Sequence, residues 1–172
     1  MYYFWARLES LFILLKPIVM NTQLDVTLQT RKILFKILNS TSREDLLTIP
    51  DGFRNNIWWN IAHVVVTQQL LVYKNSGLSM KISQELVDKY RKWTVPEGVP
   101  TDEDIDEVSG FLYATIEWTM EDLENGLFKE YNEYPTSAGV TLKNFDDATT
   151  FNLFHEGLHL GAILSLKKAL MK

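Results

Sequence analysis

Hydrophobic and polar residues of this chain recur with the period of an α-helix in four long segments. Apolar side chains return at spacings of three and four positions, which gathers them on one face of a helix. The segments cover residues 22–39, 55–73, 101–127 and 145–171. A long connection, residues 78–101, contains one short helical stretch at 83–93. Four amphipathic helices with connections of unequal length predict an all-α protein, a four-helix bundle.

Local signals refine this picture at three places. Ser42 with Asp45 three positions later resembles a capping pair for a short turn. Residues 128–141 are rich in turn-forming side chains and predict a loop or a short hairpin. The acidic run 102–107 suits the positive end of a helix dipole, and its consecutive carboxylates would splay apart around a helix. We therefore interpret that run as a charged helix start and not as a metal site.

The composition is that of an ordinary globular domain. The chain has 172 residues, of which 46% are hydrophobic and 23% charged, enough for one domain with a single core. The absence of cysteine excludes disulfides, thiolate metal ligands and a cysteine nucleophile. A net charge of -5 argues against a general nucleic-acid binder, which needs a basic surface for phosphates.

The first residues stand apart from the rest. Residues 1–19 are rich in aromatic and aliphatic side chains but are interrupted by Arg7, Glu9 and Lys16. Their uncharged runs are shorter than the roughly 20 residues that cross a bilayer, and the segment lacks the basic start of a signal peptide. We interpret residues 1–20 as an N-terminal extension, either an extra helix or a mis-assigned start. Residues 21–172 would form the domain, and we expect a cytoplasmic protein with no membrane partner.

The chemistry of the chain centres on its three histidines. His155 and His159 lie four positions apart, so a helix stacks them one turn apart on one face, where both can bind one metal ion. His63 lies far upstream in another apolar helix. Since three histidines suit a catalytic site that keeps one coordination position open, we hypothesise that all three converge on one metal.

The same stretch also fits the H-E-x-x-H motif of zinc metalloproteases, in which Glu156 would be the general base. That family needs a further ligand, often downstream, but the thirteen residues after His159 contain no Asp, Glu, His or Cys. Ser165 stands where the extended metzincin motif has histidine. We therefore expect the third ligand from upstream and an incidental Glu156, about 100° around the helix from His155.

Two segments, WWNIAH at 58–63 and HEGLHLG at 155–161, resemble the DinB/YfiT superfamily from about Met20 onward. The resemblance implies a four-helix bundle with a long crossover, one histidine in the second helix and a histidine pair in the last. It further implies a divalent metal, nickel or zinc, bound by His63, His155 and His159 with water completing the shell. Homodimers are frequent in the family, and Gly161 fits its C-terminal motif.

The resemblance also suggests a reaction. Characterised branches of the superfamily are thiol-dependent enzymes, the mycothiol-dependent maleylpyruvate isomerases and the bacillithiol S-transferases. It implies an enzyme that activates a low-molecular-weight thiol for attack on a small-molecule substrate. Two alternatives stay open: a hydrolase that uses metal-bound water, and a non-catalytic bundle in which the metal pins two helices or a ligand binds without turnover.

Residues around the histidines have competing interpretations. Trp58 and Trp59 suit core packing, although Trp59, one turn from His63, could also wall a pocket. Asn60 and Thr67 could hydrogen-bond near the metal or face outward.

The sequence also suggests roles for Gln68, Gln69 and Glu156. We expect Gln68 and Gln69 to face solvent or a dimer partner. Glu156, if it has a role, would accept a hydrogen bond from an imidazole or would face solvent.

Overall fold

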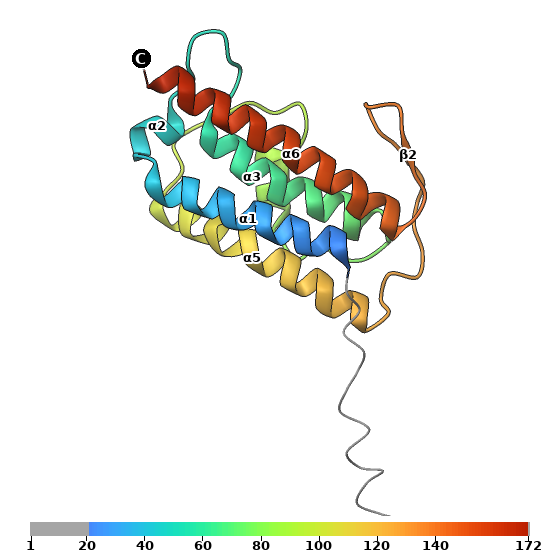
Figure 1. The fold of residues 1–172 in the computed structure, drawn as a ribbon. Coiled ribbons are helices and arrows are strands. Elements are labelled where there is room, and N and C mark those ends of the chain that lie inside the picture. The colour runs from blue at the N-terminus through green and yellow to red at the C-terminus, as the bar shows by residue number, and fades with distance from the viewer. Residues whose placement is uncertain (1–20, 172) are drawn as a thin grey trace, which may run out of the picture.

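The computed structural model describes residues 21–171, which form a bundle of four long helices with a small hairpin beside one end (Figure 1). The long helices are α1 (Thr22–Ser40), α3 (Ile57–Gln68), α5 (Asp102–Glu124) and α6 (Phe145–Leu170). The connections contain α2 (Arg43–Leu47), η2 (Gln69–Lys74), α4 (Gln84–Tyr90), β1 (Tyr134–Pro135) and β2 (Thr141–Leu142). The predicted all-α four-helix bundle is therefore confirmed.

Each α-helix begins at a polar residue whose side chain accepts a hydrogen bond from a backbone N–H of the first turn. These N-cap residues are Asn21, Ser42, Asn56, Ser83, Thr101 and Asn144. At the start of α5 the bonding is reciprocal, because Asp104 also accepts the backbone N–H of Thr101. The capping chemistry fixes the helix starts close to the positions that the sequence predicted.

The four long helices surround one core in an order that differs from their order in the chain. α1 and α3 lie diagonally opposite, and each packs against both α5 and α6. α3 and α5 run in the same direction, since Gln68 bonds to Thr119 and Tyr73 bonds to Asp122 further along both helices. Parallel neighbours cannot be joined by a short turn, so residues 75–101 cross the length of the bundle. This is the long crossover that the resemblance implied.

α3 is the most deeply packed helix, and all of its residues except Thr67 are buried. The sequence predicted one continuous helix to residue 73, but the chain widens into a π-helical turn at Gln69. Gln68 and Gln69 are 1% and 0% exposed, so the expectation that they face solvent or a dimer partner was wrong. Gln68 donates to Thr119, and Gln69 accepts the backbone N–H of Lys81. α5 and the crossover cover this end of α3, which helical periodicity alone cannot reveal.

The hairpin predicted as one alternative is present, with Tyr134 paired opposite Leu142 in antiparallel strands. It follows α5 and leads directly into α6. The expectation of an N-terminal extension falls on residues that lie outside the described part of the chain. Within residues 21–171, none of the helices combines the length and the apolar character needed to cross a bilayer.

Candidate metal centre

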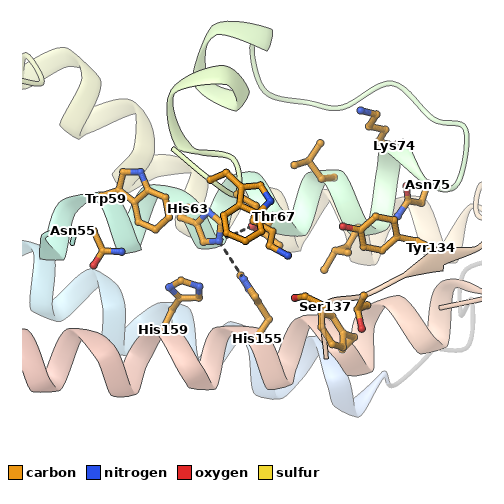
Figure 2. A pocket seen from close by; sticks show the side chains of 16 residues that line it. Asn55, Trp59, His63, Thr67, Lys74, Asn75, Tyr134, Ser137, His155 and His159 are labelled. Atoms are coloured by element: carbon orange, nitrogen blue, oxygen red, sulfur yellow. Dashed lines mark hydrogen bonds between the residues drawn. The ribbon is translucent and has the colours of Figure 1, made fainter. Parts of the chain in front are cut away.

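The three histidines meet where α3 and α6 pack against each other (Figure 2). Their candidate ligand nitrogens all lie within 4.8 Å of one another. The Nε2 atoms of His63 and His155 are 3.3 Å apart. Two imidazole nitrogens on one tetrahedral zinc ion would be separated by about 3.3 Å, given Zn–N bonds of about 2.05 Å. The cluster predicted from the sequence is therefore assembled, with a spacing that fits one divalent ion.

His63 is held by the crossover connection. Its Nδ1 lies 2.6 Å from the backbone carbonyl oxygen of Tyr90. A carbonyl oxygen only accepts hydrogen bonds, so Nδ1 carries the proton and the Nε2 lone pair points into the cluster. The hydroxyl of Thr67, one turn along α3, lies 3.2 Å from that Nε2. His63 thus has the backbone partner of an ordinary core histidine and still directs the lone pair of Nε2 toward the other histidines.

His159 is oriented by a side chain of α3. Its Nδ1 lies 2.8 Å from Oδ1 of Asn60. The amide nitrogen of Asn60 donates to the side chain of Asn55 and to the backbone carbonyl of Asn56, which fixes the oxygen toward the imidazole. Of the alternatives left open for Asn60 and Thr67, hydrogen bonding near the cluster is the one that the structure shows. Such partners set the tautomer and orientation of metal-binding histidines.

His155 differs from the other two. Its Nδ1 is buried and has no hydrogen-bond partner, while its Nε2 faces His63. A buried, unpaired ring nitrogen is costly, and it indicates that the ring position is set by something other than its own hydrogen bonds. The donor set as a whole consists of neutral nitrogen atoms, the ligands that zinc and nickel accept. The residues present therefore fit a divalent transition metal.

Burial keeps all three imidazoles neutral near pH 7. Desolvation lowers the pKa of His63, although the bond to the carbonyl of Tyr90 opposes the shift. Desolvation, followed by the repulsion that protonated His155 would meet from His159 and His63, lowers the pKa of His155 to about 2. Desolvation and the neighbouring His63 lower the pKa of His159 to about 3. Neutral imidazole is the form that binds metal, so protons compete weakly for this cluster.

Trp59 belongs both to the core and to the pocket wall. Its ring stacks on His63 with centroids 4.5 Å apart and an interplanar angle of 12°. The indole N–H donates to Thr94 on the crossover, which holds that loop beside the histidines. Trp58 is buried in the core, and its indole N–H donates to the hydroxyl of Tyr90. The core role expected for the pair is confirmed, and Trp59 also lines the pocket.

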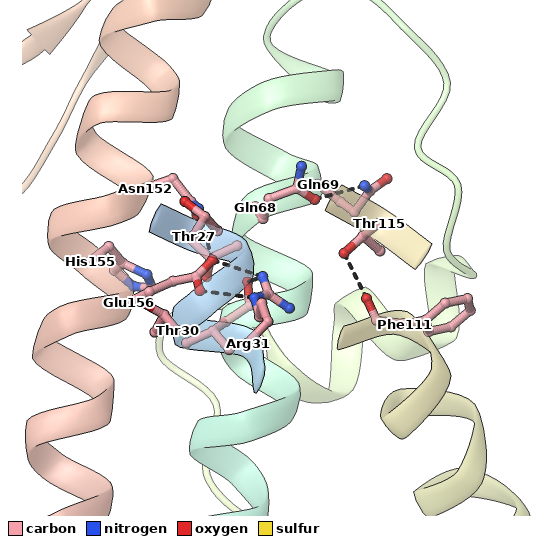
Figure 3. A network of polar contacts seen from close by, with 12 residues as sticks. Thr27, Thr30, Arg31, Gln68, Gln69, Phe111, Thr115, Asn152, His155 and Glu156 are labelled. Atoms are coloured by element: carbon pink, nitrogen blue, oxygen red, sulfur yellow. Dashed lines mark hydrogen bonds and ion pairs between the residues drawn. The ribbon is translucent and has the colours of Figure 1, made fainter. Parts of the chain in front are cut away.

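Behind the histidines lies a buried ion pair between α1 and α6 (Figure 3). Arg31 donates to both carboxylate oxygens of Glu156, at 2.9 and 2.8 Å, and to the backbone carbonyl of Val64. Asn152 donates to the same carboxylate. Both charged side chains are 0% exposed. Since Val64 follows His63 and Glu156 follows His155, Arg31 ties together the two helices that carry the histidines.

This pair corrects the sequence interpretation of Glu156. The residue does not face solvent and is not incidental, and its hydrogen bonds go to Arg31 and Asn152 instead of an imidazole. It does not line the pocket, so it cannot serve as the general base of a metalloprotease. The position of Arg31 held an overlooked signal. It occupies a buried stripe with Leu24, Thr27 and Leu34, where an apolar residue is expected.

A cavity of about 450 Å³ opens in front of the histidines. Its walls come from α3, η2, the crossover, the hairpin region and α6 (Figure 2). Apolar side chains flank the cluster, among them Trp59, Leu70, Leu71 and Phe151. The opening gives a small molecule direct access to the histidines. Sequence reasoning did not identify Tyr90, Lys92 or Trp93 on the crossover as neighbours of the cluster.

Comparison with known proteins agrees with this geometry. The model of the DinB superfamily matches residues 27–163, which include the three histidines and most of the bundle. No curated protein matches the chain. The chain belongs to the DinB superfamily.

Proposed function

We propose that this member of the DinB superfamily is a metal-dependent enzyme, with His63, His155 and His159 as the ligands of a nickel or zinc ion. We further propose that it activates a low-molecular-weight thiol for transfer to a small electrophilic substrate. The observation that carries the proposal is a cluster of three neutral imidazoles open to a cavity of about 450 Å³. A closed structural site would instead have a fourth protein ligand, and no described Asp, Glu or Cys joins the cluster.

Bound in this cluster, a divalent ion would supply Lewis-acid chemistry that lowers the pKa of a coordinated thiol or water. The chain's own residues have separate tasks. The carbonyl of Tyr90 and the amide oxygen of Asn60 keep protons on the far nitrogens of His63 and His159. Trp59, stacked on His63, keeps water from that side of the ring. The ion pair of Arg31 holds α3 and α6 in register behind the histidines.

The acidity of the nucleophile favours the thiol over the hydrolytic alternative. Water requires strong activation, and hydrolases of the H-E-x-x-H type use a glutamate base for it. Here Glu156 is buried in an ion pair, and no Asp or Glu lines the cavity among the described residues. A thiol, with an ordinary pKa of about 8.5, ionises far more readily than water and depends less on a carboxylate base.

The first experiment measures metal content by elemental mass spectrometry on tag-free protein. Wild type, His63→Ala and the exposed control Gln29→Ala are each loaded with zinc or nickel and dialysed. We expect one metal ion per chain in wild type and in the control, and loss of most of it in His63→Ala. Equal retention in His63→Ala, or no metal in any protein, would overturn the three-histidine site.

The second experiment tests the reaction. Loaded wild type is assayed with N-acetylcysteine or glutathione and an aromatic halide such as 1-chloro-2,4-dinitrobenzene, beside His159→Ala. We expect thioether formation above the uncatalysed rate only with loaded wild type. Ester hydrolysis without thiol transfer would favour the hydrolase. Binding of metal with neither activity, together with a large loss of thermal stability on metal removal, would favour the non-catalytic bundle.

We also propose that the partner of this chain is a second copy packed on the outer face of α6. Phe154, Leu158 and Leu164 on that face are 52%, 56% and 54% exposed. Gly157 and Gly161 separate them, and a side chain at either glycine would meet nothing within 4 Å in this chain. Mid-helix glycine costs about 1 kcal/mol of helix stability relative to alanine. We therefore expect both glycines to serve a contact with another chain.

A two-fold antiparallel pairing of α6 makes this face self-complementary. Centred between residues 157 and 158, the pairing places Phe154 opposite Gly161, and Leu158 opposite Gly157. The same register brings Asp147 near one end of the helix opposite Lys168 near the other. Large side chains would thus meet glycines, and charges would meet opposite charges.

Sedimentation of wild type against Leu158→Glu and Gly161→Leu tests this dimer. We expect both variants to be monomeric and folded, because residue 158 is exposed and residue 161 has free space around it. Val99→Glu, an exposed apolar site on the crossover, is the control and should remain dimeric. Monomeric wild type, or dimers in both α6 variants, would contradict the proposal.

A further inference from the structure

The cavity in front of the histidines has an unusual charge for this protein. The chain as a whole carries a net charge of -5, with 22 acidic and 17 basic residues. Of the 16 side chains that line the cavity, none is Asp or Glu and two are lysines, Lys74 and Lys92. The three imidazoles are neutral, so the lysines supply the charge of the cavity wall. A cavity with one sign of charge concentrates ligands of the opposite sign.

Within residues 21–171, neither lysine is paired with a carboxylate. Lys81 and Lys89, which lie between the two cavity lysines in the sequence, each form an ion pair with a carboxylate. Among the residues that the structure describes, no carboxylate lies within ion-pair distance of Lys74 or Lys92. Lys92 is close enough to the histidines for its charge to contribute to the lowered pKa of His155. The two cations are available to a ligand.

The two lysines lie at different positions along the cavity relative to the histidines. Figure 2 shows Lys74, with Asn75 and Tyr134, at the opposite end of the cavity from Asn55 and Trp59. Lys92 lies beside the cluster, between Tyr90, whose carbonyl contacts His63, and Thr94, whose hydroxyl contacts Trp59. A molecule with its reactive group at the histidines would therefore extend past Lys92 toward Lys74.

Trp93 gives an independent indication of a ligand. It lines the cavity, yet 84% of the residue is exposed, and its φ of 75° is the only positive value at a non-glycine position in residues 21–171. The backbone N–H of Thr94 bonds to the carbonyl of Arg91, so Trp93 is the third residue of a turn. Glycine or asparagine usually occupies a turn position with positive φ. A bulky residue there is strained, and burial in the protein does not compensate for it.

The turn that carries Lys92 and Trp93 is anchored to the candidate site on both sides. The carbonyl of Tyr90, just before the turn, accepts a hydrogen bond from the Nδ1–H of His63. The hydroxyl of Thr94, the last residue of the turn, accepts a hydrogen bond from the indole N–H of Trp59. Lys92 and Trp93 are therefore presented at a fixed place beside the histidines. The ammonium of Lys92 lies 4.8 Å from the centre of the Trp93 ring.

We propose that the cavity binds a small organic anion, whose carboxylate or phosphate group contacts Lys92 and Lys74 and whose body is covered by Trp93. This assignment rests on the proposed function, because it names the chemical class of the molecule that reacts at the same site. It selects acidic thiols or acidic electrophiles over neutral ones. Lys92 and Trp93 determine which molecules enter, and Lys74 holds the end remote from the histidines.

The test compares ligands that differ in charge but hardly in shape. Succinate is compared with succinamide, and glycerol 3-phosphate with glycerol, in metal-free and zinc-loaded protein of full length. Binding is followed by NMR through the indole N–H of Trp93, which is assigned with Trp93→Phe. The proteins are wild type, Lys74→Met, Lys92→Met, the double variant and Lys36→Met, an exposed lysine on α1 outside the cavity.

We expect wild type to prefer at least one anion over its neutral analogue by more than about fivefold for each lysine contact. Each cavity variant should lose about fivefold, the double variant should show no preference, and Lys36→Met should match wild type. The ligand pair with the larger preference for the anion shows whether the cavity recognises a carboxylate or a phosphate. Equal binding of anion and neutral analogue in metal-free wild type, or a preference unchanged in the double variant, would overturn the inference.

This outcome is separate from that of the proposed function. Charge discrimination in metal-free protein, combined with failure to retain metal, would leave the anion site and remove the metal-dependent enzyme. Retention of metal without charge discrimination would leave the metal site and remove the anion-binding assignment.

Discussion

Arg31 and Lys92 are both cations that contribute to the lowered pKa of His155, but Arg31 is buried behind the histidine cluster, whereas Lys92 lines the cavity in front of it. Arg31 is 0% exposed and bonded to Glu156 and to the backbone of α3. Lys92 is exposed in the cavity and has no ion-pair partner among the described residues. Behind the cluster, charge is paired and serves the protein. In front of it, charge is unpaired and available to a ligand.

The difference follows from the cost of removing charge from water. A buried cation without a partner would be strongly destabilising, so Arg31 requires Glu156. An exposed cation has no such requirement, and its side chain can remain solvated until an anion binds. Variants on each side of the cluster test this difference between the paired and the unpaired cation.

The largest effect is expected behind the cluster. Arg31→Met leaves the carboxylate of Glu156 buried without its partner, which should lower the free energy of unfolding by about 3–5 kcal/mol. Lys92→Met should change it by less than about 0.5 kcal/mol, because the side chain is exposed and makes no ion pair. Urea denaturation of the metal-free proteins measures both values. Similar losses of unfolding free energy in the two variants would contradict the difference proposed between the buried ion pair and the exposed lysine.

The double variant Arg31→Met/Glu156→Leu serves as the control for this prediction. It removes both charges together, so it should recover most of the stability that Arg31→Met loses. A double variant as unstable as Arg31→Met would show that packing around Arg31, and not its charge, maintains the back of the cluster.

A smaller effect is expected at the bond that orients His159. Asn60→Ala removes the acceptor of the imidazole Nδ1–H, and loss of such a partner typically weakens metal binding by about 10–100-fold. Asn75→Ala is the matched control, because Asn75 lines the cavity without contacting an imidazole. Zinc affinity is measured by competition with a chelator, with circular dichroism to verify folding. Equal affinities in the two variants would contradict a positioning role for Asn60.

The lowered pKa values predict how acid acts on the metal-free protein. In the unfolded chain histidine binds a proton with a pKa of about 6.5, whereas folded His155 and His159 resist protonation until pH about 2 and about 3. Stability from the neutral imidazoles is thus fully present above pH about 6.5 and is lost as pH falls toward the folded pKa. Between pH 6 and 5 each histidine should cost about 1 kcal/mol of unfolding free energy.

Chemical denaturation at both pH values, on wild type and His155→Gln, measures this dependence. Glutamine does not titrate, so the variant should lose about 1 kcal/mol less than wild type over the same interval. An identical pH dependence in the two proteins would show that carboxylates, and not the buried histidine, determine the acid response.

An effect of opposite sign, a small gain in stability, is expected in front of the cluster. Trp93→Asn replaces a strained tryptophan with a residue that tolerates positive φ, so the free energy of unfolding should rise by up to about 1 kcal/mol. Anion binding should weaken, because the ligand loses its cover. Thermal denaturation and the succinate titration measure the two effects. A loss of stability in Trp93→Asn would show that the tryptophan supports the fold and not a ligand.

Local patterns were sufficient for the helices and for the histidine ligand candidates. Spacings of three and four apolar residues and the polar caps Ser42 and Thr101 located the helices within a few positions. The four-residue interval between His155 and His159 placed both on one face. Such features depend on contacts within one or two helical turns, so they can be read from neighbouring letters of the sequence.

The failures all involve contacts between distant segments. Glu156 has the same spacing from His155 whether it faces solvent or a buried arginine, and only the packing of α1 against α6 makes it the partner of Arg31. Gln68 and Gln69 become buried because α5 and the crossover cover them. His63 is held by the backbone carbonyl of Tyr90. Every residue type has such a carbonyl, so the identity of residue 90 did not indicate this contact.

Short-range spacing was therefore enough to predict the helices, the histidine candidates and the resemblance to the DinB superfamily. Only the packing of distant segments shows which side of the cluster is closed by paired charges and which is open with unpaired ones. That division arises where α1, α3, α6 and the crossover meet, and burial sets its energetics. The desolvation of a charge depends on every segment that surrounds it, and no local pattern contains that information.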